Sequence, residues 1–221
     1  MRIAIIGATG MAGSAIATEA LDRGHHVTAL SRRPRADAGI DRLSARALDI
    51  EDTASLPPVL AEVDAAVLTI RLAPGEESRL ASLTRGFLDA AEQHGTPVLI
   101  VGGAAPLRSP NDPDRLLIDD PSYVPEAWKS IAQASLDQFN GCQEHRYNGW
   151  VYLSPPAILE PGERTGRYRR GTTRLLTDEN GISRITAPDL AIAVVDEVES
   201  PTGDKHFTVT ARTSDRTSTT R

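Results

Sequence analysis

The first thirteen residues, MRIAIIGATGMAG, constrain the fold of this chain more than any other stretch. Residues 3–6 form an apolar run typical of a strand buried on both faces, as in the middle of a parallel sheet. Glycines follow at positions 7, 10 and 13, and a helical pattern then runs to Arg23 and Gly24, a basic last turn with a glycine cap. The sequence therefore predicts a strand, a tight glycine turn and a helix.

Such a turn has the properties of a pyrophosphate-binding site. The backbone of a glycine turn can approach the phosphates closely, and the free N–H groups and positive dipole end of the following helix bind their charge. Side chains at positions 7, 10 or 13 would obstruct that approach or hold the helix and the strand apart. The spacing is G-x-x-G-x-x-G, which departs from the general G-x-G-x-x-G fingerprint. The alternative is a glycine-rich turn in another kind of α/β protein.

Strands and helices alternate along most of the chain. Apolar runs predict further strands over residues 26–30, 45–48, 64–70, 97–101, 149–153 and 206–211. Helical patterns predict a short helix through residue 60, a long one over 76–94, and others from 125 to about 144 and from 188 to 198. Residues 173–177 and 181–186 predict a small hairpin. The alternation predicts an α/β fold, a Rossmann-type doubly wound parallel sheet with a small C-terminal substrate-side subregion.

No linker or repeat divides the sequence, so residues 1–212 are predicted to form a single domain. The substrate-side elements are expected at about 105–122 and 155–188. Residues 105–122 contain four prolines and little periodicity, and we interpret them as a substrate lid; a surface insertion without a role is the alternative. The Ser/Thr-rich tail at residues 213–221 is predicted to be disordered.

The composition limits the partners that this chain can have. Its 221 residues are 40% apolar and 24% charged, which is ordinary for a globular domain. A formal charge of −6 argues against a nucleic-acid partner, and no apolar run approaches the length of a membrane span. The single cysteine, Cys142, cannot form an internal disulfide, which agrees with a cytoplasmic location, and it is interpreted as a semi-buried helix residue rather than a nucleophile. We expect a monomer or homodimer without a metal site that acts on a small molecule.

The residues after the second strand indicate which dinucleotide the site prefers. A carboxylate there binds the adenosine ribose of NAD, whereas arginines meet the 2′-phosphate of NADP. Here the chain reads Ser31-Arg32-Arg33-Pro34, with cations and no acidic residue. The pattern favours NADP (NADPH) over NAD, and a solvated basic loop is the alternative. Asp49, at the end of the third strand, is a candidate acceptor for the adenine amino group; a capping or solvated role is the alternative.

Five arginines lie close together in a later stretch of the sequence: Arg164, Arg167, Arg169, Arg170 and Arg174. They are candidates for binding an anionic substrate or the cofactor phosphates. The favoured interpretation is a solvated loop that pairs with acidic residues of the 105–122 segment, namely Asp112, Asp114, Asp119 and Asp120.

Six motifs occur in order along the chain: GATGMAG at 7–13, SRRP at 31–34, GGA at 102–104, LSPPA at 153–157, PGERTG at 161–166 and ITAPDLA at 185–191. Together they resemble the NAD(P)H-binding atypical short-chain dehydrogenase/reductases that are named NADH-flavin reductases, relatives of biliverdin IXβ/flavin reductase and of NmrA-like proteins. The resemblance covers residues 1 to about 211. Its glycine loop is shared by many subfamilies, whereas the set of later motifs is fairly specific.

The resemblance implies a role for these motifs in binding a nicotinamide dinucleotide. The pyrophosphate would lie on the glycine turn, the 2′-phosphate on the basic loop, the adenine after the third strand, and the ribose and nicotinamide between the turns that follow the next three strands. The residues implied are, in that order, Gly7, Ala8, Thr9, Gly10 and Met11; Ser31, Arg32 and Arg33; Asp49 and Ile50; and Ile70, Gly102, Gly103, Ser154, Pro155 and Ile158.

The chain departs from orthodox members of that superfamily at the catalytic pair. Those members place Tyr-x-x-x-Lys on the fifth helix, where one helical turn puts the phenol and the ammonium on one face and the ammonium lowers the phenol pKa. Lys129 lies on the corresponding helix, but Pro125 stands four residues before it and Tyr123 six residues before it. Tyr123 and Lys129 are the catalytic candidates, and an ordinary surface lysine is the alternative for Lys129.

These observations suggest three functions. The favoured one is an NAD(P)H-dependent reductase, preferring NADPH, that transfers hydride to a planar acceptor such as a flavin, a quinone or a tetrapyrrole-like compound, for which a solvent proton suffices. The second is a non-catalytic dinucleotide sensor of the NmrA kind, and the third is a carbonyl reductase that uses Tyr123 in a rearranged site. The missing Tyr-x-x-x-Lys disfavours the third, and the intact Ser154-Pro155-Pro156 region favours the first over the second.

Overall fold

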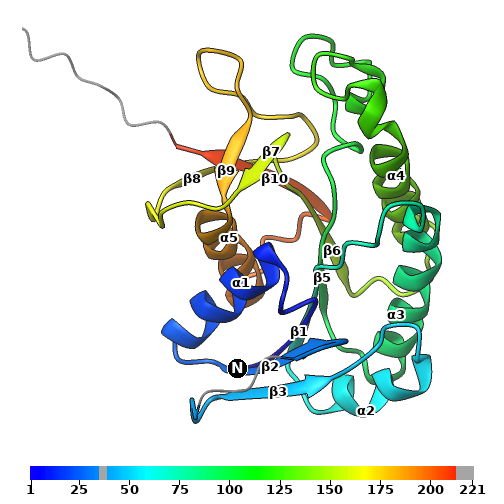
Figure 1. The fold of residues 1–221 in the computed structure, drawn as a ribbon, viewed down its shortest axis with the longest axis vertical. Helices are drawn as coiled ribbons and strands as arrows, with labels where there is room; N and C mark the ends of the chain where they lie inside the picture. Colours follow the sequence, from blue (N-terminus) through cyan, green and yellow to red (C-terminus); the bar gives the residue numbers. More distant parts are fainter. Residues whose placement is uncertain (35–38, 213–221) are drawn as a thin grey trace, which may run out of the picture.

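An eight-stranded sheet runs through the centre of the molecule (Figure 1). The computed structural model describes residues 1–34 and 39–212, so the predicted tail at 213–221 lies outside the described residues. In spatial order the strands are β3 (Leu43–Ala47), β2 (His26–Ser31), β1 (Arg2–Ile6), β4 (Ala65–Leu68), β5 (Val98–Val101), β6 (Trp150–Ser154), β10 (His206–Ala211) and β8 (Tyr168–Gly171). All neighbours are parallel except β8, which is antiparallel to β10. This order confirms the predicted doubly wound fold.

Helices cover both faces of the sheet (Figure 1). On one face α1 (Met11–Asp22) lies beside α5 (Ala187–Glu199), and on the other lie α2 (Leu56–Ala61), α3 (Leu80–His94) and α4 (Lys129–Gln143). Short 3₁₀ turns lead into the helices of the second group, at Thr53–Ser55, Glu77–Arg79 and Glu126–Trp128, and a further one spans Leu117–Asp119. Within residues 1–34 and 39–212, none of the helices combines the length and the apolar composition needed to cross a membrane.

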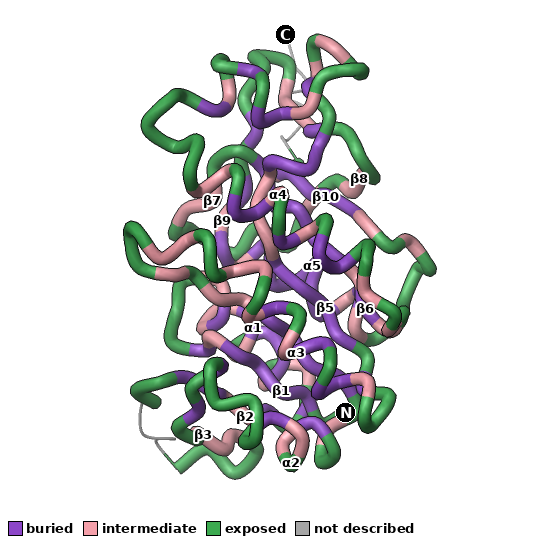
Figure 2. Tube along the Cα trace, turned by 90° about the vertical axis from the view of Figure 1, so that its right-hand side faces the viewer, coloured by how far each residue is buried: buried purple, intermediate pink, exposed green. Residues whose placement is uncertain are grey.

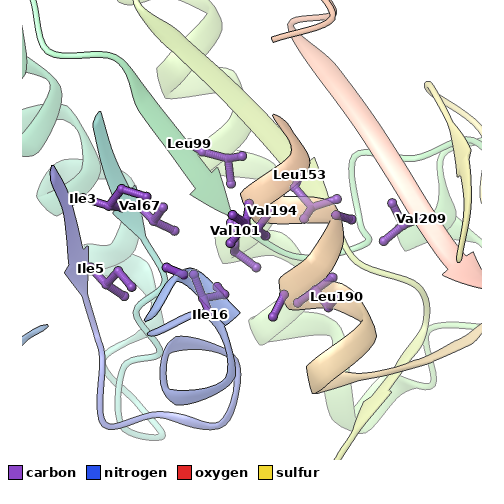
Figure 3. Close-up of a cluster of buried hydrophobic side chains, with 14 of the residues drawn as sticks. Ile3, Ile5, Ile16, Val67, Leu99, Val101, Leu153, Leu190, Val194 and Val209 are labelled. Atoms are coloured by element: carbon purple, nitrogen blue, oxygen red, sulfur yellow. The ribbon is translucent and has the colours of Figure 1, made fainter. Parts of the chain in front are cut away.

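Successive strand residues point to opposite faces, so the sheet has an apolar core on each side. Figure 3 shows the first core, in which strand residues such as Ile5 and Val67 pack with Ile16 of α1 and with Leu190 and Val194 of α5. Fully burying each of these large side chains contributes roughly 1.5–3 kcal/mol. Burial follows the strands and the inner faces of the helices, while the connecting loops are largely exposed (Figure 2).

Cys142 belongs to the second core, on the side of α3 and α4. Its thiol is fully buried, and burial raises its pKa to about 12. A thiol with so high a pKa carries almost no thiolate at neutral pH. The structure therefore agrees with a packing role rather than a nucleophilic one.

The hairpin predicted over residues 173–177 and 181–186 is wrong. Only Arg184–Thr186 forms a strand, β9, and it pairs in parallel with β7 (Ile158–Glu160) in a separate two-stranded sheet. The strand that precedes this region is instead β8, whose sequence YRRG carries no apolar alternation. The prediction failed because pairing with distant strands, and not local pattern, decides where these short segments lie.

Residues 105–122, predicted as a lid, are folded back onto the protein. Leu107 and Leu117 are fully buried and form a small third core with Val124 and Leu175. Backbone bridges also join Arg108 to residues 116 and 174. The segment is therefore a packed layer beyond the end of β5, held to the chain around residue 175.

Candidate functional site

The carboxyl ends of the parallel strands meet at one edge of the sheet, where ligands bind in folds of this class. β1 and β4 are neighbours, but the chain continues from β1 to β2 and from β4 to β5, so the topological switch point lies between β1 and β4. The predicted cofactor-binding residues lie at the carboxyl end of a strand of the large sheet or within a few residues after it. The structure therefore brings them to the same edge.

Two glycines of the first turn are required by its geometry. Gly7 has φ +91°, and a side chain there would place its Cβ 2.0 Å from the carbonyl oxygen of Thr69. A Cβ on Gly13 would lie 2.2 Å from the carbonyl oxygen of Gly7, so α1 packs directly on the turn. Gly10 is the N-cap residue of α1 and donates its N–H to the Gly7 carbonyl. The strand, the turn and the helix thus approach one another as a pyrophosphate site requires.

The N-terminus of α1 keeps hydrogen-bond donors available. The backbone N–H groups of Thr9, Met11 and Ala12 have no acceptor among the described residues. The first turn of α1 contains no acidic residue, and no side chain caps it. Free N–H groups at the positive end of a 12-residue helix form an anion site, and the negative charge of a pyrophosphate fits it.

The end of β2 carries further unsatisfied polar groups beside this turn. The carbonyl of Leu30 accepts the N–H groups of residues 7 and 8, which places the end of β2 directly against the glycine turn. The hydroxyl of Ser31 is buried and has no partner among the described residues. Arg32 and Arg33 are exposed, and neither pairs with a carboxylate in the part of the chain that the structure describes. A buried hydroxyl and two guanidinium groups without partners fit a ribose phosphate.

Asp49 has a local partner at the end of β3. Its carboxylate accepts the backbone N–H of Glu51 at 3.1 Å and stabilises the turn there. The Asp49 side chain is exposed, whereas the neighbouring Ile50 is buried in the second core. Asp49 therefore makes a local turn contact and does not cap the following 3₁₀ turn, whose N-cap is Asp52, and contact with an adenine ring stays a prediction.

The turn after β5 reveals an internal reason for its two glycines. A Cβ on Gly102 would lie 1.9 Å from the hydroxyl oxygen of Tyr152, and a Cβ on Gly103 would lie 2.6 Å from Oγ of Ser135. Both glycines are thus required by the packing of β6 and α4 beneath them, apart from any ligand that passes above. No local sequence pattern signalled Tyr152 or Ser135, because each meets the turn through long-range packing.

The last residue of β6, Ser154, contacts a histidine of β10. Ser154 is fully buried, and its Oγ lies 2.9 Å from Nε2 of His206, whose pKa is lowered to about 4 by burial. Pro155 is also buried, while the side chain of Ile158 is 39% exposed. Ile70, after β4, is partly buried beside Gly7. Of these four predicted nicotinamide neighbours, Ile158 is the one with an exposed side chain.

A family described as NAD(P)H-binding matches residues 7–201 of the chain. The chain belongs to this NAD(P)H-binding family. The match begins at the first glycine of the turn and extends past the end of α5. It confirms the resemblance stated from the six sequence motifs.

Solved structures of relatives share the fold of this family member. A provisionally named exported protein from Burkholderia pseudomallei is 39% identical, with a TM-score of 0.84 over 95% of this chain and 99% of that chain. A provisionally named NADH-flavin reductase from Streptococcus pneumoniae is 29% identical, with a TM-score of 0.86 over 96% and 100%. A provisionally named epimerase from Bacteroides thetaiotaomicron is 31% identical, with a TM-score of 0.86 over 96% and 97%. These three names differ in the activity that they describe.

In this family member the two catalytic candidates are directed to different partners. The Tyr123 hydroxyl donates to the carbonyl of Gly181 at 3.4 Å, and burial, with a smaller contribution from Asp120, raises its pKa. A neighbouring ammonium would instead lower that pKa. Lys129 pairs with Glu126 at 3.1 Å on the surface. The structure therefore does not assemble Tyr123 and Lys129 into a pair, because a 3₁₀ turn separates Tyr123 from α4.

The predicted pairing of the 164–174 arginines with the acidic residues of 105–122 is wrong. Arg164 binds Glu19 of α1 through two hydrogen bonds of 2.8 and 3.0 Å, and Arg170 binds Glu197 of α5 at 2.8 Å. Two others donate to backbone carbonyls, Arg169 to that of Thr177 and Arg174 to that of Pro110. Arg164, Arg170 and Arg174 thus fasten the substrate-side segment to α1, to α5 and to residue 110, whereas Arg169 binds within the segment.

Sequence reasoning missed Glu19, the buried carboxylate that anchors this segment. Arg164 lowers its pKa through hydrogen bonds that outweigh the effect of burial, and Arg23 lowers it further. Glu19 lies three residues after Ile16, within the buried stripe of α1. An acidic residue at that spacing was the available signal, because a buried carboxylate needs a cationic partner. Glu19 holds the segment after β7 against α1. The N-terminus of α1 and the glycine turn at residues 7–13 together form the anion site, which we call the glycine cradle.

Proposed function

We propose that this protein is an NAD(P)H-dependent oxidoreductase, preferring NADPH, that transfers hydride to a flavin, a quinone or a similar planar acceptor. The observation that carries the proposal is the glycine cradle, where Gly7 and Gly13 permit close backbone approach and the N–H groups at the start of α1 lack acceptors among the described residues. Family membership and a relative provisionally named NADH-flavin reductase support it.

The preference for NADPH rests on the end of β2. Arg32 and Arg33 are exposed there beside the buried hydroxyl of Ser31. Guanidinium groups bind a phosphate ester with charge-assisted hydrogen bonds, each worth about 1.5–3 kcal/mol. A ribose without the 2′-phosphate would leave both arginines solvated and would gain nothing from them.

The site would act chiefly by positioning. When bound, a reduced nicotinamide supplies the hydride. The cradle would hold the two phosphates, and the turns after β4, β5 and β6 would orient the ring and exclude water from one of its faces. Tyr123 donates to a backbone carbonyl and has a raised pKa, so it does not suit the role of proton donor. An acceptor that can take its proton from solvent matches such a site better than a carbonyl compound does.

The test is a fluorescence titration with NADPH and NADH, followed by assays of NADPH oxidation with flavins, quinones and aldehydes. We expect tighter binding of NADPH and turnover of a flavin or a quinone. Tight binding without turnover of any acceptor would instead favour the dinucleotide sensor. Aldehyde turnover that disappears in Tyr123→Phe would favour the carbonyl reductase, and failure to bind either nucleotide would overturn the proposal.

A further inference from the structure

Two glycine–tyrosine contacts lie at opposite ends of the sheet. At the carboxyl end, the Tyr152 hydroxyl occupies the space that a side chain on Gly102 would need, with the Cβ position 1.9 Å from the hydroxyl oxygen. At the amino end, the Tyr147 hydroxyl has the same relation to Gly149, at 2.0 Å. The two contacts are alike in chemistry, but only the first lies at the carboxyl edge of the sheet, where the candidate cofactor crevice is.

Tyr152 connects the turn after β5 to α4. Its side chain is fully buried, and its hydroxyl oxygen accepts the backbone N–H of Gly103 at 3.3 Å. The hydroxyl also lies 3.1 Å from the carbonyl of Ser135 and 3.1 Å from Oε1 of Gln138, and it can donate its single proton to either acceptor. One side chain on β6 thus binds the backbone of the turn and the helix that covers it.

The network continues to α3, which fixes Gln138 in turn. The Gln138 amide donates to Oγ1 of Thr84 at 2.9 Å, and that hydroxyl donates to the carbonyl of Leu80 at 2.9 Å. Gln138 and Thr84 are both buried. Burial also raises the pKa of Tyr152, so its phenol stays neutral over the working range of pH. Each side chain in this chain of contacts makes at least one hydrogen bond within the network, and such buried networks are rigid.

We propose that Tyr152 is a positioning residue whose hydroxyl fixes the Gly102–Gly103 turn against which the nicotinamide ring lies during hydride transfer. The inference rests on the proposed function, which assigns the nicotinamide to this turn. Tyr152 is fully buried and acts through the backbone of the turn, so it needs no contact with cofactor or acceptor. Loss of the hydroxyl alone would leave the Gly103 N–H without its acceptor and open space beneath Gly102.

The chemical step is more sensitive to such a change than binding is. Hydride transfer depends steeply on the distance and alignment of the reacting atoms, and a shift of about 1 Å can reduce a rate roughly 100-fold. Most of the dinucleotide's binding groups lie elsewhere, on the cradle and the basic loop. The expected effect of Tyr152→Phe is therefore a fall in kcat of about tenfold, with the Kd for NADPH changed less than about twofold.

The experiment compares Tyr152→Phe with Tyr147→Phe as a matched control. Tyr147 donates its hydroxyl to the carbonyl of Thr96 at 2.7 Å, so Tyr147→Phe loses one hydrogen bond next to a glycine. Tyr152→Phe loses the bond accepted from Gly103 and the one donated to α4. Four quantities are measured in each: the melting temperature, the Kd for NADPH, kcat with the deuterium isotope effect from labelled NADPH, and the fluorescence lifetime of bound NADPH. Amide hydrogen exchange at Gly103 is measured without nucleotide.

We expect both variants to melt a few degrees below the wild-type protein. Only Tyr152→Phe should lower kcat, raise the isotope effect, change the lifetime of bound NADPH and accelerate exchange at Gly103. If Tyr152→Phe does not fold, Gln138→Met replaces it. This variant keeps the bond from Gly103 but leaves the Ser135 carbonyl as the acceptor for the hydroxyl proton, and it should give smaller changes of the same sign.

The outcomes separate this inference from the proposed function. Equal kinetics and equal NADPH lifetimes in the two tyrosine variants would overturn the positioning role while leaving the reductase intact. A wild-type protein that binds NADPH without turnover would count against the reductase, and the lifetime of bound NADPH would still test Tyr152. A wild-type protein that binds no NADPH would overturn both.

Discussion

The two halves of the crevice differ in how their polar groups are satisfied. On the nucleotide half, formed by the glycine turn and the end of β2, the N–H groups of α1, the hydroxyl of Ser31 and the two adjacent arginines lack partners among the described residues. On the substrate half, after β5 and β6, the side chains beneath the turns bind one another, as Tyr152 binds Gln138 and His206 binds Ser154. The buried hydroxyl of Thr208, beside Ser154, is an exception without a partner among the described residues.

The difference indicates that the nucleotide half binds an anionic ligand by charge, whereas the substrate half positions the reacting groups by its shape. Polar groups in a folded protein are normally paired, so a cluster without partners at a helix N-terminus is a place prepared for an anion. The substrate half, whose turns rest on the paired side chains of Tyr152 and Ser154, offers a rigid surface instead. The nucleotide half should therefore dominate affinity, and the substrate half should dominate the rate of the chemical step and the stability of the turns.

The largest effect is expected from filling the cradle. Gly13→Ala places a methyl group 2.2 Å from the Gly7 carbonyl oxygen, so α1 must move off the turn, and NADPH affinity should fall by about 30-fold or more. Gly75→Ala is the control, because Gly75 has φ +90° but open space around it, so it adds backbone strain of about 1 kcal/mol without a clash. Fluorescence titration measures both.

A second variant separates binding from stability at the same place. Met11 is exposed at the start of α1, and Met11→Asp puts a carboxylate beside the free N–H groups. The change should stabilise the helix by about 0.3–1 kcal/mol while repelling the phosphates. NADPH binding of wild-type strength in both Gly13→Ala and Met11→Asp would show that the nucleotide does not lie on this turn.

The next effect concerns the choice of nucleotide. Arg32→Ala and Arg33→Ala should each weaken NADPH binding by about 10- to 100-fold and leave NADH binding within about twofold, because only NADPH carries the 2′-phosphate. Arg46→Ala, on the exposed surface of β3 and paired with Glu62, is the matched control. Titration of both nucleotides at two salt concentrations checks the result. Equal losses for NADPH and NADH would place these arginines on another part of the nucleotide.

The same contrast explains how much the sequence predicted. The nucleotide half depends on neighbours along the chain, and its signals are local: Gly7, with φ +91°, directly follows β1, and Gly10 is the N-cap of α1. The first strand, the turn and the first helix were predicted together for the same reason. A short apolar run, an obligatory glycine and a cap each act over a few residues.

The substrate half depends on contacts between distant segments, which no local pattern records. Residues 181–186 were predicted to pair with 173–177, but β9, at their end, pairs with β7 instead, and β8 was missed entirely. Arg164 was expected to meet acidic residues of 105–122 and instead binds Glu19 on the first helix. Tyr152 and Gly102 were each visible in the sequence, yet their contact exists only after β5 and β6 have paired.

A smaller effect is expected on the pH dependence of stability, and it arises in the substrate half. His206 has a folded-state pKa of about 4 and an ordinary unfolded value of 6.5, so the unfolded chain binds the extra proton first as pH falls. The stability that neutral His206 contributes is complete above pH 6.5 and is lost progressively toward pH 4. In the wild-type protein this protonation should lower the free energy of unfolding by about 1–3 kcal/mol between about pH 7 and pH 4.5. His206→Gln should abolish that decrease.

Denaturant unfolding at several pH values measures the slope of the free energy of unfolding against pH. His94→Gln, at an exposed position at the end of α3, is the control and should keep the wild-type slope. If His206→Gln also shows the wild-type slope, protonation of the His206 imidazole is not what destabilises the protein between about pH 7 and pH 4.5.

The smallest effects are expected from Tyr123 and Lys129, the candidates for the catalytic pair of orthodox short-chain dehydrogenase/reductases. Tyr123→Phe and Lys129→Ala should each change turnover of a flavin or quinone by less than about twofold, whereas loss of a general acid costs about 100-fold or more. Stability should change little, because the Lys129–Glu126 pair is exposed and such pairs contribute about 0–1 kcal/mol. Steady-state kinetics with each acceptor measures the effect. A loss of about 100-fold in either variant would mean that the substrate half supplies a proton donor after all, and the division between a charged binding half and a rigid positioning half would fail there.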